Sequence, residues 1–317
     1  LFTGISSGVN IVVARDYASG RYEKVSREVH TAITLSVLFG LAACMIGMLG
    51  ARTVLRLMGS PEGVIDLSAI YLMFYYTGMP AIVVYNFGAA ILRSIGDTKR
   101  PMYYLIVSGV LNVILNLFFV IVMHMGVAGV GLATSISNYV SALLVVISLV
   151  REDSCLKLSL SGLRIHGKTA GEMLRMGVPA GLQGSLFGLS NVMIQSSVNS
   201  FGPVYMAGNA ASQSIEGFQF AFLMANMNTA LTFVSQNFGA RQYARIRKIY
   251  WNITLSGMAI TMLIGIVFCI FRYQLLGLYN SDPAVQAVGC RRLIICALVA
   301  ALEVPMDTIF NTIRGYG

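Results

Sequence analysis

The chain has 317 residues, of which 56% are apolar and 11% are charged, and its net charge is +9. Soluble globular proteins carry about 25% charged residues, so this composition excludes most cytosolic enzymes and predicts a protein that lies in lipid. The basic residues fall in short loops between apolar runs. That pattern indicates membrane topology and no nucleic-acid partner.

The chain contains nine apolar segments. Each except the first, which is cut short, reaches the ~20 residues that a membrane-spanning helix needs. The runs are too long for strands, so the sequence predicts an all-α polytopic membrane protein. The segments lie near residues 1–14, 31–55, 64–92, 101–123, 127–150, 174–199, 204–237, 250–278 and 286–314.

The number of lysine and arginine residues alternates between high and low from one loop to the next. Seventeen fall in one set of loops and five in the other, which is typical of the positive-inside rule. We therefore expect the rich loops to be cytoplasmic, in a multi-pass protein of the inner or plasma membrane. These loops lie near residues 15–30, 93–101, 151–173 and 239–249, and the poor loops hold Arg52, Arg56, Arg272, Arg291 and Arg292.

The chain also repeats itself when it is shifted by 221 residues. The loop at 17–22 then falls on 238–243, and Arg93 falls on Arg314. Six spans separate the copies, and because six is even the copies point the same way. This indicates a parallel repeat about an axis along the membrane normal.

The repeat predicts two helical bundles of about six helices each in a complete protein. We expect a first bundle at 1–150, a cytoplasmic linker at 151–173 and a second bundle at 174–317. On this arithmetic the sequence is a fragment that lacks the first helix and the last two.

Four motifs carry a family resemblance. They are Leu92-Arg-Ser-Ile-Gly-Asp-Thr-Lys-Arg-Pro101, Gly126-Val-Ala-Gly-Val-Gly-Leu-Ala-Thr-Ser-Ile-Ser137, Phe233-Val-Ser-Gln-Asn-Phe-Gly-Ala240 and Ile313-Arg-Gly-Tyr-Gly317. Because these four motifs occur in this order, the sequence resembles the multidrug and toxic compound extrusion (MATE) family. The resemblance extends from the second helix of that family to its tenth. The resemblance implies a secondary active transporter, not an enzyme, that exchanges Na⁺ or H⁺ for organic, often cationic and lipophilic, compounds. It would use no cofactor besides the coupling ion, and we expect a monomer.

Two carboxylates lie inside the ninth segment. Glu303 and Asp307 are four residues apart, hence on one helix face, and Glu303 is ~16 Å from Arg314 along the helix. An ionisable residue at that depth costs at least ~2.5–3.5 kcal/mol, so it is a functional candidate. The resemblance to the MATE family implies that Glu303 corresponds to the carboxylate position of Na⁺-coupled members. It likewise implies that Asp307 corresponds to an acidic position of other bacterial members. The pair could hold Na⁺, although no metal site is evident from spacing.

Two further candidates belong to the second bundle. Glu216 shares a polar helix face with other residues at three- and four-residue spacing, which predicts a face lining a cavity. These residues are Asn209, Ser212, Gln213 and Gln219. Gln183 follows Pro179 by one turn and could face the same cavity.

In the first bundle, Asn112 and Asn116 lie one turn apart. They match an Asn-x-x-x-Asp pair that helps to form a cation site in some members, with Asn116 in place of the acid. Thr134 matches a threonine near that site. The alternative for all three residues is interhelical hydrogen bonding.

Other functions remain open at this point. A lipid-linked saccharide flippase of the same superfamily would want a basic cavity, and no Arg or Lys is expected deep inside a span. An intramembrane enzyme would need a nucleophile or metal set, and none is visible. A passive channel is less compatible with a two-bundle repeat and a buried acid pair.

Overall fold

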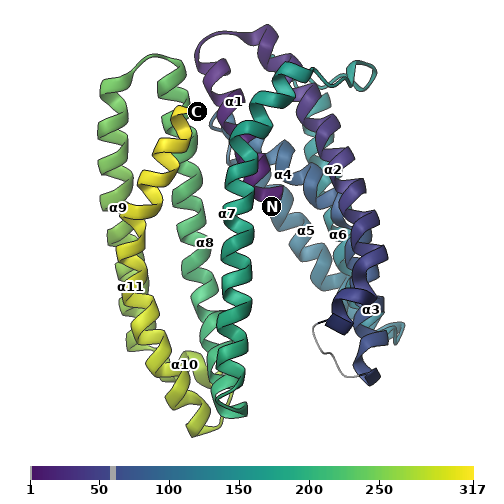
Figure 1. Ribbon diagram of the computed structural model, residues 1–317, viewed down its shortest axis with the longest axis vertical. Coiled ribbons are helices and arrows are strands. Elements are labelled where there is room, and N and C mark those ends of the chain that lie inside the picture. The colour runs from purple at the N-terminus through teal and green to yellow at the C-terminus, as the bar shows by residue number, and fades with distance from the viewer. Residues whose placement is uncertain (1, 58–61) are drawn as a thin grey trace. The chain divides into compact units, whose positions relative to one another are not determined.

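The computed structural model describes residues 2–57 and 62–317, and every regular element in these ranges is a helix (Figure 1). Contacts divide the chain into unit 1, residues 1–181, and unit 2, residues 182–317. The α-helices are α1 (Phe2–Ala18), α2 (Tyr22–Leu57), α3 (Glu62–Thr77), α4 (Met79–Ser94), α5 (Lys99–Leu117), α6 (Gly126–Val150), α7 (Gly167–Asn199), α8 (Pro203–Gly239), α9 (Tyr243–Ile270), α10 (Arg272–Gly277) and α11 (Pro283–Tyr316).

The helices follow the predicted apolar segments closely, with three differences. The segment at 64–92 is broken at Gly78, where α3 and α4 meet at a 43° bend. Pro80 lies in the first turn of α4 and cannot donate a backbone hydrogen bond, which explains the break. The segment at 101–123 ends in a π-helical turn, Phe118–Val122. The segment at 250–278 is divided into α9 and α10.

Five described helices are long and apolar enough to span a membrane, or six if α3 and α4 form one bent span. Helices α7 and α8 fall outside this set because of their lower hydropathy, so the expectation that their segments span the membrane stays a prediction. These helices are 33 and 37 residues long, but Ser, Asn, Gln and Gly dilute their apolar residues. Helices of this mixed composition can lie in lipid when they bury their polar face against other helices.

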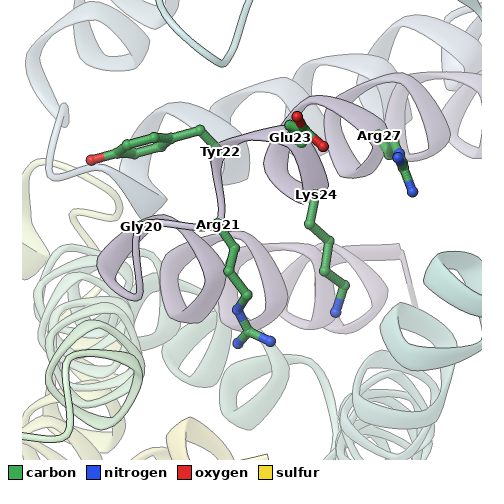
Figure 2. Close-up of a pocket in the computed structure, with 6 residues that line it drawn as sticks. All are labelled: Gly20, Arg21, Tyr22, Glu23, Lys24 and Arg27. Atoms are coloured by element: carbon green, nitrogen blue, oxygen red, sulfur yellow. The ribbon is translucent and has the colours of Figure 1, made fainter.

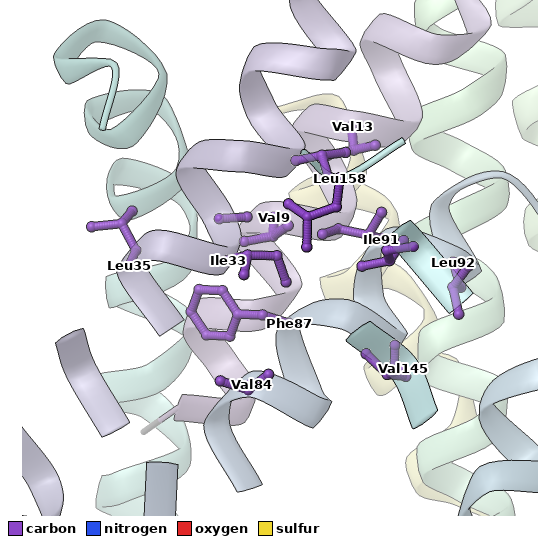
Figure 3. Packing of buried hydrophobic residues seen from close by; sticks show 14 of the residues in the cluster. Val9, Val13, Ile33, Leu35, Val84, Phe87, Ile91, Leu92, Val145 and Leu158 are labelled. Atoms are coloured by element: carbon purple, nitrogen blue, oxygen red, sulfur yellow. The ribbon is translucent and has the colours of Figure 1, made fainter. Parts of the chain in front are cut away.

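Unit 1 contains the larger apolar core. Side chains of α1, α2, α4 and α6 meet there, with Val9, Ile33, Phe87 and Val145 among them (Figure 3). By contrast, α5 buries only Pro101 and Ser108 and exposes large apolar side chains along most of its length. An apolar surface of that extent is compatible with lipid and not with water.

The segment that we expect to be a linker packs onto unit 1. Leu156 and Leu158 are fully buried in its core, and the Leu158 amide donates to the Leu149 carbonyl at 2.9 Å. The Ser159 amide donates to Nε2 of His30 at 3.0 Å. Residues 155–159 are therefore a fixed part of unit 1.

Two glycine pairs let α1 and α7 approach each other closely within unit 1. Gly4 and Gly8 on α1 lie against Gly181 and Gly177 on α7. A Cβ atom on Gly4 would lie 2.2 Å from the Gly181 backbone nitrogen, and one on Gly8 would lie 2.3 Å from the Met173 carbonyl oxygen. Both pairs have the four-residue spacing of small residues at membrane helix interfaces.

The turn between α4 and α5 is fixed by Gly96 and Asp97. Gly96 has a φ of +91°, which glycine adopts without strain. Oδ1 of Asp97 accepts from the backbone amides of Lys99 and Arg100, each at 3.1 Å. Partial burial would raise the pKa of Asp97, but the hydrogen bonds from Arg100 and Lys99 outweigh it and hold that pKa below its usual value. Arg100 also binds Glu152 at 2.6 Å, which ties the start of α5 to the residues after α6.

Candidate functional site

Glu303 and Asp307 lie in the C-terminal half of α11, in unit 2. The helix begins with Asp282, whose Oδ1 accepts from the Ala284 amide at 2.8 Å, and with Pro283 in its first turn. These two residues are a favourable helix start. Glu303 is exposed and Asp307 is half-buried. Within residues 2–57 and 62–317, neither carboxylate accepts a hydrogen bond or forms an ion pair, so both are available to a ligand.

Arg314 lies about two turns beyond Asp307 on α11. Its guanidinium donates to Oε1 of Gln183 on α7. Gln183 therefore has a positively charged partner in unit 2. The expectation that Gln183 faces a cavity is not tested by this contact, but its carbonyl oxygen is already engaged.

Glu216 forms an ion pair that the sequence did not predict. Arg292 on α11 binds it through two nitrogens, with Nη2 2.9 Å from Oε2 and Nε 3.2 Å from Oε1. Ser212 donates to Oε1 of the same carboxylate at 2.8 Å. Arg292 also donates to Oδ1 of Asn209, whose amide nitrogen donates to Gln195 on α7 at 2.9 Å. Polar side chains thus join α7, α8 and α11.

The assignment of Arg291 and Arg292 to a loop is wrong. The Asp282–Pro283 start places α11 three residues earlier than the apolar segment suggested, so Arg292 lies in the third turn of the helix. The position of Arg292 inside the apolar segment 286–314 was the signal that could have revealed it. Arg292 is the tenth residue of this 34-residue helix, so the expectation of no arginine deep inside a span is not contradicted by it and stays a prediction.

The polar face of α8 packs against other helices. Gln219 is buried, and its Nε2 donates to the backbone carbonyls of Thr261 on α9 and Ala297 on α11, at 3.0 and 2.9 Å. Asn209 and Ser212 are buried as well. The expectation that this face lines a cavity is therefore wrong for these three residues, because neighbouring helices cover their side chains.

The pair of Glu216 and Arg292 supports a stability prediction. Replacing Arg292 by leucine leaves a partly buried carboxylate without its cation, so we expect the free energy of unfolding to fall by ~3–5 kcal/mol. The double variant Glu216→Leu with Arg292→Leu removes both charges and should recover most of that loss. Denaturant unfolding in mixed micelles measures both values. Equal losses in the single and double variants would show that the pair is not coupled.

The three candidates of the first bundle lie together in unit 1. Asn116 donates to Oδ1 of Asn112 at 3.0 Å, and Asn112 lies 3.5 Å from the Thr134 hydroxyl. Thr134 in turn donates to the Val130 carbonyl at 2.9 Å. Oδ1 of Asn116 is buried and accepts no hydrogen bond within the part of the chain that the structure describes. The cluster therefore has one free carbonyl oxygen and no carboxylate.

No group of three or more His, Cys, Asp or Glu side chains suited to a metal ion occurs in the described ranges 2–57 and 62–317. A Na⁺ ion at Glu303 and Asp307 would take carboxylate oxygens together with backbone or water oxygens. The donor set is chemically suited to a monovalent cation or a proton and is too small for a closed transition-metal site.

Comparison with known proteins agrees with this architecture. The MatE family model matches residues 1–118 and 179–317. The probable multidrug resistance protein YoeA of Bacillus subtilis is 28% identical over 99% of this chain and 69% of its own length. The probable multidrug resistance protein NorM of Neisseria meningitidis is 25% identical over 99% of this chain and 70% of its own. A FAD transporter of Shewanella oneidensis is 23% identical over 89% of this chain and 63% of its own.

The fold is also similar to solved structures. An outward-facing multidrug resistance MATE family transporter of the MOP superfamily superposes with a TM-score of 0.92 at 20% identity, over all of this chain and 71% of its own. The Vibrio cholerae MATE transporter VcmN in its bent form superposes with a TM-score of 0.84 at 20% identity, over all of this chain and 72% of its own. At this identity the likeness concerns the fold alone.

Apolar helices in two units, together with charged groups inside them, define a multi-pass membrane transport protein. The chain belongs to the MatE family of multidrug transporters, and the family members are transporters and not enzymes. It spans 69% of the first of these relatives, and 56% of a second Bacillus subtilis protein, YpnP.

Proposed function

We propose that this protein exports organic, often cationic and lipophilic, compounds in exchange for Na⁺ or H⁺, with Glu303 and Asp307 carrying the exchange. The observation that supports this proposal most is the pair of carboxylates one turn apart on α11, neither of which has a partner in the described residues. A carboxylate in an apolar helix is costly, and it is retained where a cation or proton compensates it.

The chemistry of exchange follows from competition for this charge. When Na⁺ or H⁺ neutralises the carboxylates, an organic cation loses its counter-ion and leaves. When the small ion departs, the negative charge is again available to an organic cation. Two carboxylates on adjacent turns repel each other, so they act as one unit and not as two independent sites. Glu216 contributes less in this scheme because Arg292 already neutralises it.

We place the protein in the plasma membrane as a monomer, with the loops near 15–30, 93–101, 151–173 and 239–249 in the cytoplasm. The alternation of Lys and Arg supports this orientation. The relative named as a FAD transporter carries a multiply charged compound, so substrates within the family vary. We favour organic cations here because the unpartnered charges of the candidate site are negative.

Transport in proteoliposomes tests the proposal. We expect the protein to drive efflux of a fluorescent lipophilic cation when a Na⁺ or a pH gradient is imposed, and a protonophore separates the two ions. Protein-free liposomes are the control. Efflux at the same rate with and without either gradient would contradict antiport. If no flux is observed, lipid flipping is the next activity to assay.

A further inference from the structure

A second group of charged residues lies in unit 1, where α1 turns into α2. Asp16 near the end of α1 and Glu28 in the second turn of α2 are both fully buried, each with 0% exposure. Neither belongs to the candidate transport site, which lies in unit 2. Buried carboxylates require compensation by cations, hydrogen bonds or protons.

The two carboxyl groups have very different partners. Asp16 forms ion pairs with Arg15 at 3.4 Å, Arg21 at 2.5 Å and Lys24 at 2.8 Å. For Glu28 the nearest cation is Nζ of Lys24, at 3.9 Å. Neither oxygen of Glu28 accepts a hydrogen bond from an N–H or hydroxyl group within the described part of the chain.

The remaining charged group at this corner comes from α7. Glu172 binds Lys24 at 2.9 Å and Arg15 at 3.1 Å. Three cations therefore face Asp16, Glu28 and Glu172. The close ion pairs of these three cations go to Asp16 and Glu172, so none of the three lies within hydrogen-bond distance of Glu28.

Nζ of Lys24 lies 2.8 Å from Oδ2 of Asp16 and 3.9 Å from Oε1 of Glu28, so the two buried carboxyl groups adjoin the same ammonium group. Neither this Asp16 oxygen nor either Glu28 oxygen has a hydrogen-bond partner among the described residues, and a hydrogen bond between the two carboxyl groups would supply one. An ionised carboxylate only accepts hydrogen bonds, so two ionised carboxylates cannot form one. Such a hydrogen bond therefore requires a proton on one of the two carboxyl groups. It would also give the buried oxygens of Glu28 the partner that they lack.

Water can reach this corner. An open hollow of about 550 Å³ is lined by Gly20, Arg21, Tyr22, Glu23, Lys24 and Arg27 (Figure 2). Figure 2 shows Arg21 and Lys24 extending to the same side of the corner, with Tyr22 pointing away from them. Lys24 thus borders the hollow and contacts Asp16, which gives a proton a short route between solvent and the carboxyl pair.

We propose that Asp16 and Glu28 form a proton-binding site, in which Glu28 is a carboxylic acid that donates a hydrogen bond to the Asp16 carboxylate. The pair then carries one negative charge, which Arg15, Arg21 and Lys24 neutralise. When base removes the proton, two negative charges face each other in a buried space, and α1 and α2 are pushed apart. The site makes unit 1 sensitive to alkaline pH independently of Glu303 and Asp307.

The sign of the effect follows from proton counting. At neutral pH the folded protein holds a proton that an exposed glutamate of the unfolded chain has released. Unfolding therefore releases one proton, and stability falls as pH rises until Glu28 ionises in the folded protein as well. When unfolding releases one proton, the unfolding equilibrium constant increases about tenfold for each unit by which the pH rises.

Denaturant unfolding of the purified protein in mixed micelles, from neutral to alkaline pH, tests the site. Glu28→Gln should fold as well as the wild type at neutral pH, because its amide can donate to Asp16 as the acid does. It should also lose the tenfold dependence per pH unit. Glu23→Gln, which changes an exposed glutamate on the same helix, should keep the wild-type dependence.

Two outcomes would overturn the proposal. A Glu28→Gln variant with the wild-type pH dependence would show that the titrating group is another one. A Glu28→Gln variant that is unfolded at neutral pH would show that the ionised form of Glu28 is needed. Infrared spectroscopy adds a direct check, since the carbonyl stretch of a protonated carboxylic acid should be present at neutral pH and weaker in Glu28→Gln.

Discussion

Replacing Glu303 by glutamine is expected to reduce gradient-driven efflux to the level of protein-free liposomes. Glutamine keeps the size and shape of the side chain, but it removes the charge and replaces one acceptor oxygen by an amide NH2 donor. Without that charge the site can neither hold Na⁺ or H⁺ in exchange nor attract an organic cation. Glu303→Asp retains the charge on a shorter side chain and should keep part of the transport. The measurement is efflux of a fluorescent lipophilic cation from proteoliposomes under a Na⁺ or pH gradient.

Asp153→Asn provides the control for this experiment, because its side chain is 98% exposed and lies outside the helices of both units. It should transport like the wild type. Transport that survives Glu303→Gln would contradict the assignment and would move the coupling site to Asp307 or Glu216. Because Asp307 lies one turn away, Asp307→Asn should lower transport less than Glu303→Gln if Glu303 is the principal carboxylate.

Replacing Gly8 by alanine is expected to lower the free energy of unfolding by about 1–3 kcal/mol, the cost of overpacking a close interface. The new Cβ would lie 2.3 Å from the Met173 carbonyl oxygen and 2.7 Å from the Gly177 backbone nitrogen. Both neighbours are backbone atoms of α7, so the helices must move apart before the methyl group fits. Denaturant unfolding in mixed micelles measures the change.

Gly109→Ala is the matched control, because a Cβ on Gly109 in α5 meets no atom within 4 Å. Alanine is the better helix former by about 1 kcal/mol, so this change should leave stability equal or raise it. The two glycine substitutions thus have opposite expected signs. A Gly8→Ala variant as stable as Gly109→Ala would show that α1 and α7 do not pack at these glycines.

Much of the architecture followed from the sequence alone. Runs of about 20 or more apolar residues predict helices because lipid leaves backbone groups no partner outside the helix, and this rule is local. The structure confirmed the helical fold, and its helices follow the apolar segments closely. The spacing of Glu303 and Asp307 was also readable, because residues four apart share a helix face whatever surrounds it. Their role in ion exchange stays a prediction.

The partners of charged and small residues were decided only by the tertiary structure. Arg292 binds Glu216 across 76 positions of sequence, and Lys24 binds Glu172 across 148. Hydropathy and periodicity describe one helix at a time, whereas these contacts depend on how helices rotate and approach each other. The same limit applies to Gly4 and Gly8, whose spacing is visible in the sequence but whose partners on α7 are not. Packing alone therefore determined that Arg292 neutralises Glu216, while the carboxylates of α11 have no hydrogen-bond or ion-pair partner in the described part of the chain.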